Sequence, residues 1–375
     1  MLAKLPNNAA ILIAAISGRS LAAAARRAGL RPLVADLFND ADTVRLAERA
    51  TRLSGSIQAG IDPHRLVETL RSLAEGHEPI ALVYGSGFER QPDAIEAVAK
   101  EFVVAGNTAQ AIREIKDPAN LSRLCLELGI SHPEISTEAP SEFAGWLTKI
   151  GGGAGGSHVK PASGDVAGDG RYFQRFVTGR NLSALFVANG TSARIVGFSR
   201  QWSSPHPGAP FRYGGAVRLR RYDRTRTTQI ATWLTALTQR VRLVGLCSAD
   251  FIASDRDLSL IEINPRPGAT LDIFDSEATP LLLQHLRAVS GATISVPAYG
   301  GSVASAIAYT RKPIKAFPPI AWPAMTADHQ TSGTALDAGD PVCTVFATAH
   351  SASAAERAVK SRVRALAIHW EEGFA

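Results

Sequence analysis

The chain has 375 residues, of which 45% are hydrophobic and 20% are charged. This balance excludes a disordered or collagen-like protein and is typical of a globular protein of two or three domains. No apolar run reaches the roughly 20 residues that a membrane helix needs, so we expect no membrane partner. The three scattered cysteines indicate a reducing compartment, so we expect a cytoplasmic location.

The formal net charge of +6 favours anionic partners. The basic residues are nevertheless scattered, and only residues 218–226 form a dense run, which is more often a solvated face than a binding strip. Since no stripe of aromatic and basic residues accompanies this run, we expect small phosphorylated molecules, and no nucleic acid, as partners. The three cysteines lie far apart without a CxxC pair, so we expect neither a disulfide framework nor a zinc site.

The first part of the chain has the pattern of a parallel α/β domain. An apolar run at 9–16 predicts a strand, and a turn then leaves Ser20 as the expected N-cap of an alanine-rich helix that ends near Gly29. The segment "PLVADLF" at 32–38 predicts the next strand, so the chain begins with a β-α-β unit. We therefore expect an N-terminal parallel α/β domain over residues 1–110.

Two further units are expected after this domain. The helical segment "DPANLSRLCLELGI" leads into strands that alternate with glycine loops, a texture typical of an α+β domain built on antiparallel sheet. We expect this second domain to cover residues 111–295. Residues 296–375 contain short strand patterns and the helical segment "SAAERAVKSRVRALAIHWEEG", which predict a small β-rich C-terminal unit with a terminal helix.

The stretch "GLCSADFIASDRDLSLIEINPRPGA" predicts a hairpin with an acid at the centre of each strand. If the hairpin is symmetric about Arg256, Asp250 lies directly opposite Glu262, and Asn264 shares their face. Because facing carboxylates repel each other, something positive must lie between them, and such oxygen ligands suit Mg²⁺. Arg266, between two prolines, would then point a forked donor at whatever the metal holds. The alternative is that the acids are strand-end charges paired with Lys or Arg, and a bulge at the turn would shift the register by one residue.

The stretch "GGGAGGSHVKPASGDVAGDG" is rich in glycine but is not a P-loop, because Lys160 lies in a predicted strand and is followed by proline. The glycines suit a mobile flap that approaches phosphates closely, and a flexible linker is the alternative. A buried ammonium at Lys160 would need an anionic partner. Lys116 is a further candidate cation or an ordinary surface lysine. The segment "YFQRFVTGRNLSALF" predicts a strand, a turn at Gly179 and a return strand, which is either a hinge for an adenine ring or a plain hairpin.

Taken in order, Lys116, "HVKPASG", "FQRFVTGRNLS" and "SADFIASDRDLSLIEINPR" resemble the ATP-grasp superfamily, in which two α+β lobes clamp ATP and Mg²⁺. The resemblance spans nearly the whole chain and implies a pre-ATP-grasp domain, a two-lobed ATP-grasp domain and a small C-terminal domain. It also implies ATP and Mg²⁺ (or Mn²⁺) as cofactors. The residues that it assigns are Lys116 and Lys160 on the nucleotide phosphates, Gln174, Arg175, Phe176 and Val177 in the adenine hinge, Asp250, Glu262 and Asn264 on the metal, and Arg266 with Lys160 as the catalytic cations.

Two departures from the superfamily pattern concern the nucleotide. Arg175 stands where many relatives carry Glu. The electrostatic contact that this Glu makes with the nucleotide is therefore not expected here, whereas backbone contacts with the nucleotide are. The loop after Lys160 contains Asp165 and Asp169, which would repel phosphates unless they point away or meet a metal ion or an amine substrate.

More narrowly, "AISGRSLAAAARRAGLRPLVADLF", "VYGSGFE", "AGN" at 105–107 and "AGDPVCTVFA" are similar to ATP-grasp carboligases of the tetrahydromethanopterin and methanofuran pathways of one-carbon metabolism. This similarity implies an amide-forming ligase in the biosynthesis of a pterin or furan one-carbon carrier cofactor.

The resemblance implies that a substrate carboxylate attacks the γ-phosphate of ATP and that an amine captures the acyl phosphate, so that the partners are a small-molecule acid and amine. This chemistry needs no Ser/His/Asp or Cys/His arrangement, and the sequence offers none. The substrate candidates are Arg19 and Ser20, which follow the first strand, and Arg212, each with a plain turn as the alternative. A homodimer is compatible with this function. The rival function is a non-catalytic ATP-binding or regulatory protein with the same fold.

Overall fold

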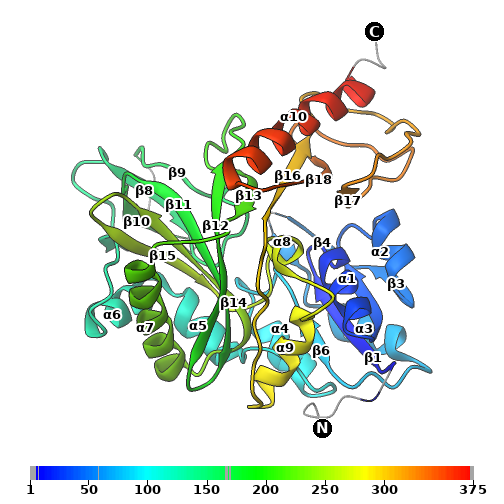
Figure 1. The fold of residues 1–375 in the computed structure, drawn as a ribbon, viewed down its shortest axis with the longest axis horizontal. Helices are drawn as coiled ribbons and strands as arrows, with labels where there is room; N and C mark the ends of the chain where they lie inside the picture. The colour runs from blue at the N-terminus through cyan, green and yellow to red at the C-terminus, as the bar shows by residue number, and fades with distance from the viewer. Residues whose placement is uncertain (1–5, 7, 58, 165–167, 169, 372–375) are drawn as a thin grey trace.

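The computed structural model of the chain describes residues 6, 8–57, 59–164, 168 and 170–371. Within this part of the chain the strands form sheets of four, four, eight and two strands (Figure 1). The N-terminal sheet is parallel and the two large central sheets are antiparallel, so the expected combination of an α/β unit with α+β units is confirmed. No helix of the described residues is long and apolar enough to cross a membrane.

The N-terminal sheet has the strand order β3-β2-β1-β6. Its strands are β1 (Ala10–Ala15), β2 (Arg31–Asp36), β3 (Arg49–Arg52) and β6 (Leu82–Tyr84), its helices are α1 (Arg19–Arg27), α2 (Ala41–Leu46), α3 (Leu66–Ala74) and α4 (Asp93–Ala99), and β4 (Gly55–Ser56) pairs with β5 (Gly60–Ile61). Alternate residues of β1 point to opposite faces. Ile11 and Ile13 pack with α1 and the later helix α9 (Leu281–Val289), whereas Leu12 packs with α3 and α4.

Helix α1 begins earlier than the sequence predicts. Its N-cap residue is Gly18, so the expected N-cap at Ser20 is wrong. The Gly18 N–H donates to Asp36 Oδ2 at 2.7 Å, and a Cβ on Gly18 would lie only 2.4 Å from Val34 Cγ1. The turn after β1 therefore packs so closely against β2 that it requires glycine, and the helix starts directly after this contact.

The central part of the chain opens with two helices and a small antiparallel sheet of order β7-β10-β8-β9. These elements are α5 (Ala109–Lys116), α6 (Pro118–Glu127), β7 (Ile135–Ser136), β8 (Trp146–Ile150), β9 (Lys160–Pro161) and β10 (Arg171–Arg175). Asp117 separates the helices and caps α6, where its side chain accepts from the Asn120 N–H. We call this sheet with its loops the small lobe.

The eight-stranded sheet has the order β15-β14-β11-β12-β13-β16-β18-β17 and forms the large lobe. Its strands are β11 (Arg180–Asn189), β12 (Ala193–Ser203), β13 (Tyr213–Arg218), β14 (Val244–Ala253), β15 (Leu258–Asn264), β16 (Ser302–Tyr309), β17 (Thr326–Ala327) and β18 (Pro341–Ala349), and its helices are α7 (Arg224–Val241), α8 (Leu271–Phe274), α9 and α10 (Ala352–Glu371). Because β13 pairs with β16, the sheet runs without interruption across the expected boundary at residue 295.

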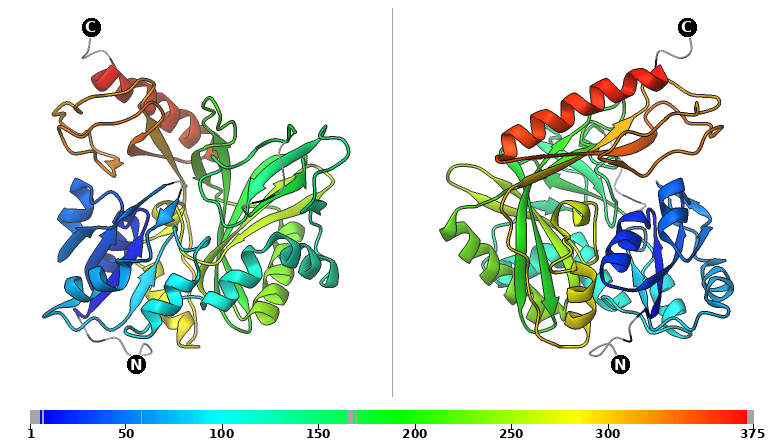
Figure 2. Two further views of the ribbon diagram at one scale, coloured as in Figure 1. Left: turned by 180° about the vertical axis from the view of Figure 1, so that it is seen from behind. Right: turned by 45° about the vertical axis from the view of Figure 1, so that its right-hand side comes forward.

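The helices cover the two faces of this sheet and its C-terminal end. Alternation along β11 places Phe186 against α6 and α7 and Leu185 against α8 and α9. Figures 1 and 2 show α10 lying along β16 and β18, where Val359 and Trp370 pack into a separate core cluster. The acid-bearing strands β14 and β15 therefore lie at the edge of the sheet that is farthest, in strand order, from this cluster.

Strands β10 and β11 belong to different sheets and do not pair with each other. The alternative of a plain hairpin around Gly179 is therefore wrong. Residues 176–179 instead connect the small lobe to the large lobe, which is the position that a hinge requires.

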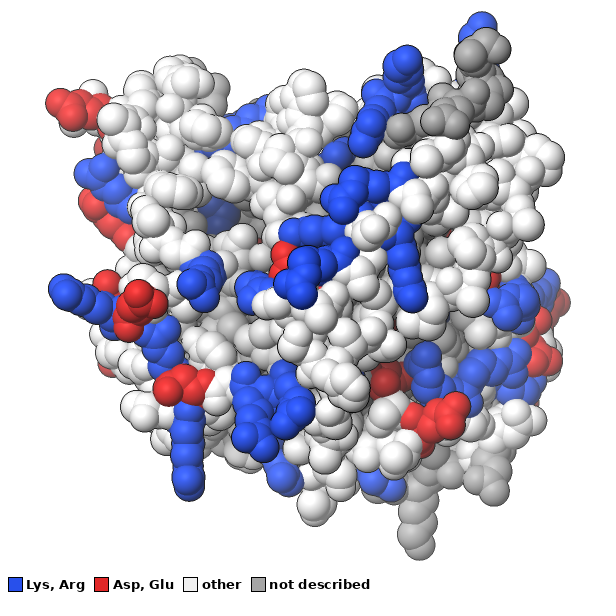
Figure 3. Space-filling view, turned by 45° about the horizontal axis from the view of Figure 1, so that its top comes forward, with Lys and Arg blue, Asp and Glu red and all other residues white. Residues whose placement is uncertain are grey.

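Figure 3 shows the face that lies toward α10, where Lys and Arg side chains occur in several groups with uncharged surface between them. This distribution agrees with the scatter of basic residues along the sequence. The expectation that nucleic acid is not a partner stays a prediction.

Asn107, in the "AGN" segment, links the N-terminal domain to the acid-bearing hairpin. Its Nδ2 donates to the carbonyl oxygens of Val244 at 2.9 Å and Pro265 at 2.8 Å, and its Oδ1 accepts from the Val244 N–H at 2.8 Å. Asn107 is buried, so no water can replace these bonds. One side chain thus fixes the start of β14 and the residue after β15.

We expect Asn107→Ala to lower the free energy of unfolding by about 2–3 kcal/mol, because the Val244 N–H and the carbonyl oxygens of Val244 and Pro265 lose this partner. Urea denaturation followed by circular dichroism would measure the change. Asn181→Ala, at an exposed position of β11, is the matched control and should change the free energy by less than about 0.5 kcal/mol. Equal effects of the two substitutions would contradict this role of Asn107.

Candidate active site

Two acids face each other across the β14–β15 hairpin. The strands pair Asp250 with Glu262 and Ser248 with Asn264, as symmetry predicts. A bulge directly after Asp250 shifts the register by one residue toward the turn, so the symmetric pairing is confirmed at the acids and is wrong beyond them. Asp250, Glu262 and Asn264 therefore share one face, where Asn264 Nδ2 donates to Asp250 Oδ2 at 3.0 Å. We call these three residues the acid cluster.

The Lys116 ammonium lies against the acid cluster. Lys116 is the last residue of α5, and its Nζ donates to Glu262 Oε1, to Asn264 Oδ1 at 3.0 Å and to the Ile263 carbonyl oxygen at 3.2 Å. The side chain is buried. The cation that repulsion between the acids requires is thus supplied in part by the protein. The expected contact of Lys116 with a nucleotide phosphate stays a prediction.

Lys149 is a second buried cation, which the sequence analysis missed. It is the last but one residue of β8 and donates to Gln174 Oε1 at 3.2 Å. Burial lowers the pKa of Lys149, and the negative charges of Glu262 and Asp250 oppose this shift, which places the ammonium within the field of the acid cluster. A signal was present in the sequence: "WLTKIGGG" has a lysine in an apolar strand directly before the glycines, the same anomaly as the acids in the hairpin.

The two acids differ in their protonation. Burial raises the pKa of Asp250, and the charge of the facing Glu262 raises it further. Burial would also raise the pKa of Glu262, but Lys116 and Lys149 outweigh it and lower this pKa to about 2. Glu262 is therefore the firmly ionised member of the pair, and a further cation near Asp250 would restore its charge as well.

Arg266 lies directly beyond the acid cluster and is held by the N-terminal domain. Its Nε donates to Glu89 Oε1 at 2.7 Å, and the other Glu89 oxygen accepts from the Gly87 N–H at 2.8 Å. Both side chains are buried. Burial would raise the pKa of Glu89, but Arg266 and Lys116 outweigh it and lower this pKa, so the two groups form a charged pair. Glu89 lies in the segment "VYGSGFE", and the sequence analysis did not identify it as a site residue.

The residues assigned to the adenine hinge lie between the lobes. Gln174 is buried in the small sheet, and Arg175 is exposed with its guanidinium 4.4 Å from the centre of the Trp146 ring. Phe176 is 51% exposed and Val177 is half-buried. This arrangement leaves apolar surface free at the hinge, and the contact of these four residues with adenine stays a prediction.

The glycine loop between β8 and β9 packs against both neighbouring parts of the protein. A Cβ on Gly152 would lie 2.7 Å from the Glu89 carbonyl oxygen, and a Cβ on Gly156 would lie 2.2 Å from the Phe211 carbonyl oxygen. Both glycines have positive φ, at 69° and 73°. The loop thus approaches backbone on two sides so closely that these positions require glycine.

Lys160 follows this loop on the short edge strand β9 and is exposed, unlike Lys116 and Lys149. The cations that lower the pKa of Glu262 are those of Lys116 and Lys149. Lys160 instead lines a cavity beside the glycine loop. Its expected contacts with phosphate stay predictions, and Asp165 and Asp169 lie outside the described residues.

Arg19 is surrounded by carboxylates of the protein itself. Its guanidinium donates to both oxygens of Asp272 at 2.7 Å and to those of Asp328 at 2.8 and 2.9 Å. The side chain is only 8% exposed. Arg19 thus connects the N-terminal domain with α8 and with the residue that follows β17. The expectation that it contacts substrate stays a prediction.

No described contact joins Ser20 or Arg212, the other two substrate candidates, to the acid cluster. Ser20 is half-buried in the first turn of α1. Arg212 stacks on the Tyr309 ring at 3.7 Å and donates to the carbonyl oxygens of Ser204 at 3.0 Å and Gly339 at 2.8 Å. These backbone bonds hold the guanidinium in place, and a substrate contact of Ser20 or Arg212 stays a prediction.

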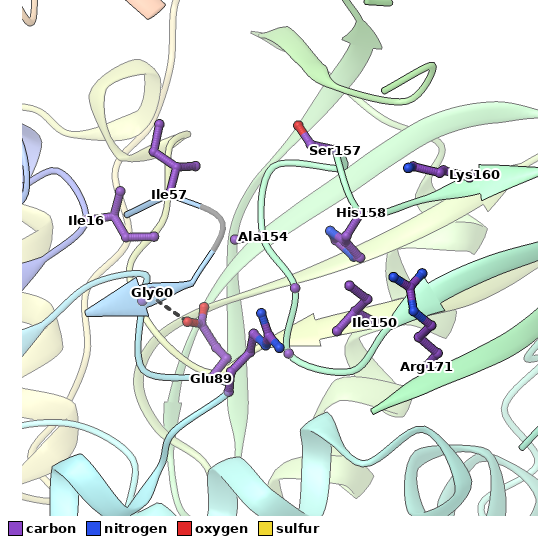
Figure 4. Close-up of a pocket in the computed structure, with 14 residues that line it drawn as sticks. Ile16, Ile57, Gly60, Glu89, Ile150, Ala154, Ser157, His158, Lys160 and Arg171 are labelled. Atoms are coloured by element: carbon purple, nitrogen blue, oxygen red, sulfur yellow. Dashed lines mark hydrogen bonds between the residues drawn. The ribbon is translucent and has the colours of Figure 1, made fainter. Parts of the chain in front are cut away.

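A cavity of about 220 Å³ lies between the N-terminal domain and the small lobe, as Figure 4 shows. The N-terminal domain and the small lobe each provide part of its wall. They contribute Ile16, Ile57, Gly60, Gly87, Glu89 and Arg90 on one side and Ile150, Gly152, Gly153, Ala154, Ser157, His158, Lys160 and Arg171 on the other. Since Glu89 holds Arg266, the cavity adjoins the end of the acid-bearing hairpin.

Comparison with known proteins gives a family for the central part of the chain. Residues 121–270, which include the small lobe and the acid-bearing hairpin, match the family described as ATP-grasp domain. Comparison with curated protein sequences found no match.

Several solved structures are similar over nearly the whole chain. N5-carboxyaminoimidazole ribonucleotide synthetase, solved with ADP, is 14% identical, with 99% of this chain and 100% of that chain covered and a TM-score of 0.71. The biotin carboxylase domain of 2-oxoglutarate carboxylase from Hydrogenobacter thermophilus, solved with MgADP and bicarbonate, is 11% identical, with 95% and 90% covered and a TM-score of 0.70. The L-amino acid ligase from Bacillus licheniformis is 11% identical, with 95% and 97% covered and a TM-score of 0.67.

We expect Arg19→Met to lower the free energy of unfolding by about 3 kcal/mol, because it leaves two largely buried carboxylates unpaired. Arg31→Met removes an arginine whose only ion pair among the described residues is at 3.7 Å to Glu48 and whose Nε donates to the Asn8 carbonyl oxygen. As the control it should cost less than about 1 kcal/mol. Urea denaturation would measure both. Unchanged stability of Arg19→Met together with a raised KM would instead favour a substrate contact.

If Lys149 contacts the phosphates of MgATP, Lys149→Met should weaken MgATP binding roughly tenfold or more, because a charge-assisted contact is then lost. Lys160→Met removes an exposed ammonium and should weaken MgATP binding less than about threefold. Titration with a fluorescent ATP analogue would compare the two variants, which carry the same change. A larger effect at Lys160 would show that the exposed lysine is the phosphate contact.

Proposed function

We propose, from the premise that this chain is an ATP-grasp protein in its fold and in residues 121–270, that it is an ATP- and Mg²⁺-dependent ligase joining a carboxylate to an amine. The observation that carries the proposal is the acid cluster: two facing carboxylates on buried strands, with Lys116 and Lys149 against them and Arg266 beyond. Burying so many charged groups in one place costs stability, and a functional site is the usual reason why a protein retains them.

The donor set of the acid cluster fits a hard divalent cation. Asp250, Glu262 and Asn264 present carboxylate and amide oxygens on one face, which are the ligands that Mg²⁺ and Mn²⁺ take in proteins. Burial and the charge of Glu262 raise the pKa of Asp250, so a cation beside Asp250 would favour its ionised form. These three residues would hold the ion, which when bound would neutralise charge on the phosphates of ATP.

The residues of the chain itself would bring a carboxylate and a triphosphate together. Both are anions, so their approach requires fixed positive charge in a site that excludes water. Lys116 and Lys149 would orient the phosphates, and Arg266, fixed by Glu89, would hold the substrate carboxylate with its remaining donors. The carboxylate oxygen would then attack the γ-phosphorus, ADP would leave, and an amine would displace phosphate from the acyl phosphate to form an amide.

The similar structures include both carboxylases and an amino acid ligase, so bicarbonate is the second acid to consider. The resemblance of "AISGRSLAAAARRAGLRPLVADLF" and "AGN" to the carboligases of one-carbon metabolism favours amide formation in the biosynthesis of a pterin or furan carrier, and this pathway stays a prediction. The same holds for the expected homodimer. A non-catalytic ATP-binding protein is the alternative that differs in class.

Release of ADP and phosphate from MgATP tests the proposal directly. We expect release to require both an acid and an amine, measured over a panel of acids that includes bicarbonate and glutamate and of amines that includes tyramine-like amines and pterins, with the amide identified by mass spectrometry. Release with bicarbonate alone among the acids would point to a carboxylase. ATP binding without release for any pair would favour the non-catalytic protein.

We expect Glu262→Gln to lower the turnover rate roughly a hundredfold or more, because it removes the ionised carboxylate of the acid cluster, while the circular dichroism spectrum stays unchanged. Glu277→Gln, at an exposed position after α8, makes the same change outside the site and should leave turnover unaltered. Activity of Glu262→Gln equal to that of the wild type would remove the metal assignment.

A further inference from the structure

The cavity beside the glycine loop lies at the point of the N-terminal sheet where ligands of open α/β sheets bind. In the order β3-β2-β1-β6 the chain first moves from β1 to β2 on one side and later places β6 on the other side of β1. The crevice between the carboxyl ends of β1 and β6 is therefore the switch point of the sheet. Ile16 directly follows β1 and Gly87 follows β6, and both line the cavity.

The small lobe presents two cations to this cavity from the strands on either side of β8. Arg171 on β10 pairs with Ile150, and Lys160 on β9 pairs with Thr148. Because Thr148 and Ile150 are two residues apart on β8, all four residues share one face of the small sheet. Figure 4 shows Lys160 and Arg171 on the side of the cavity opposite Ile16 and Ile57.

The charges around the cavity are unbalanced. Glu89 is the only acid among its described lining residues, and Arg266 already neutralises it. Lys160 and Arg171 are both exposed, and neither side chain has a hydrogen bond or ion pair to any residue that the structure describes. His158 adds no charge at neutral pH, since burial lowers its pKa. An apolar wall thus faces a wall whose positive charge no described residue compensates, which attracts an anion with an apolar body.

We propose that this cavity binds the acid substrate of the ligase by a second anionic group, held by Lys160 and Arg171, with a short apolar body against Ile16, Ile57 and Ile150. The inference rests on the proposed function and names the class of its acid: a compact molecule with two anionic groups, of which the one nearer Arg266 reacts. At about 220 Å³ the cavity lies below the roughly 300 Å³ lower bound of pockets for larger ligands, which favours a molecule of a few carbons.

Binding without ATP tests this inference separately from catalysis. The probes are glutarate, its monoamide, which has nearly the same size and one charge less, and 3-phosphonopropanoate, titrated into the full chain and followed by NMR or calorimetry. We expect glutarate to bind at least about fivefold more tightly than the monoamide, the factor that corresponds to the ~1 kcal/mol of an exposed ion pair. Tighter binding of the phosphonate than of glutarate would identify the second group as a phosphate.

Lys160→Met and Arg171→Met should each remove most of the preference for glutarate and leave binding of the monoamide within about twofold. Arg364→Met, which removes the same charge from the exposed face of α10, is the matched control and should preserve the preference. Equal binding of glutarate and its monoamide, no binding of any probe, or loss of preference in the control would overturn the inference.

If the preference follows Lys160 and Arg171 but no acid and amine release ADP, the cavity assignment stands and the ligase function falls. If ADP release succeeds with acids that carry one charge and the cavity shows no preference, the ligase function stands and the cavity assignment falls.

Discussion

The repulsion between Asp250 and Glu262 is the constraint on which the rest of the structure depends. Two carboxylates placed directly opposite each other on partly buried strands destabilise a hairpin, and they do so more strongly where water is excluded. The protein keeps Glu262 charged through Lys116 and Lys149, while Asp250 has a raised pKa. This compensation is incomplete in a way that suits a site for further cations and polyanions, because a fully compensated cluster would leave nothing for a ligand to stabilise.

The compensating groups come from different parts of the chain, so the cluster exists only when the parts have assembled. Lys116 comes from the helix that leads out of the N-terminal domain, and Lys149 comes from the small lobe. Arg266 follows the hairpin itself but is fixed by Glu89 of the N-terminal domain. Asn107 joins that domain to the carbonyl of Pro265, next to Arg266. The geometry of the acid cluster and the packing of the domains therefore depend on the same contacts.

Much of the site could be predicted from the sequence, because local patterns carried it. Acids at the centres of two alternating strands around a short turn identified Asp250 and Glu262, and the spacing fixed their pairing up to the bulge. The same pattern could have identified Lys149, which is a charged residue in an apolar strand. The sequence analysis instead selected Lys160, which is exposed. The protein partners of Arg19 could not be predicted in this way. Its carboxylate neighbours, Asp272 and Asp328, are 253 and 309 residues away, and nothing local distinguishes a guanidinium that binds a ligand from one that binds the protein.

The fold shows the same division between local and distant information. Burial patterns at 9–16 and 32–38 predicted the parallel N-terminal strands, because each strand is apolar on both faces. The connection from β10 to β11 was ambiguous, since whether two consecutive strands pair depends on partners that neither strand encodes. For the same reason the extent of the large sheet could not be read from the sequence.

The pairing of β13 with β16 makes the last unit part of the large lobe and not an appendage. A chain that stopped near residue 295 would leave the backbone of β13 as an open edge, and open edges recruit strands from other molecules. It would also uncover the face of Val217, which packs with Ala304 and Ala306. Loss or exchange of the C-terminal unit during evolution would thus have to replace a strand, not only a domain, which restricts the partners with which this terminus could be recombined.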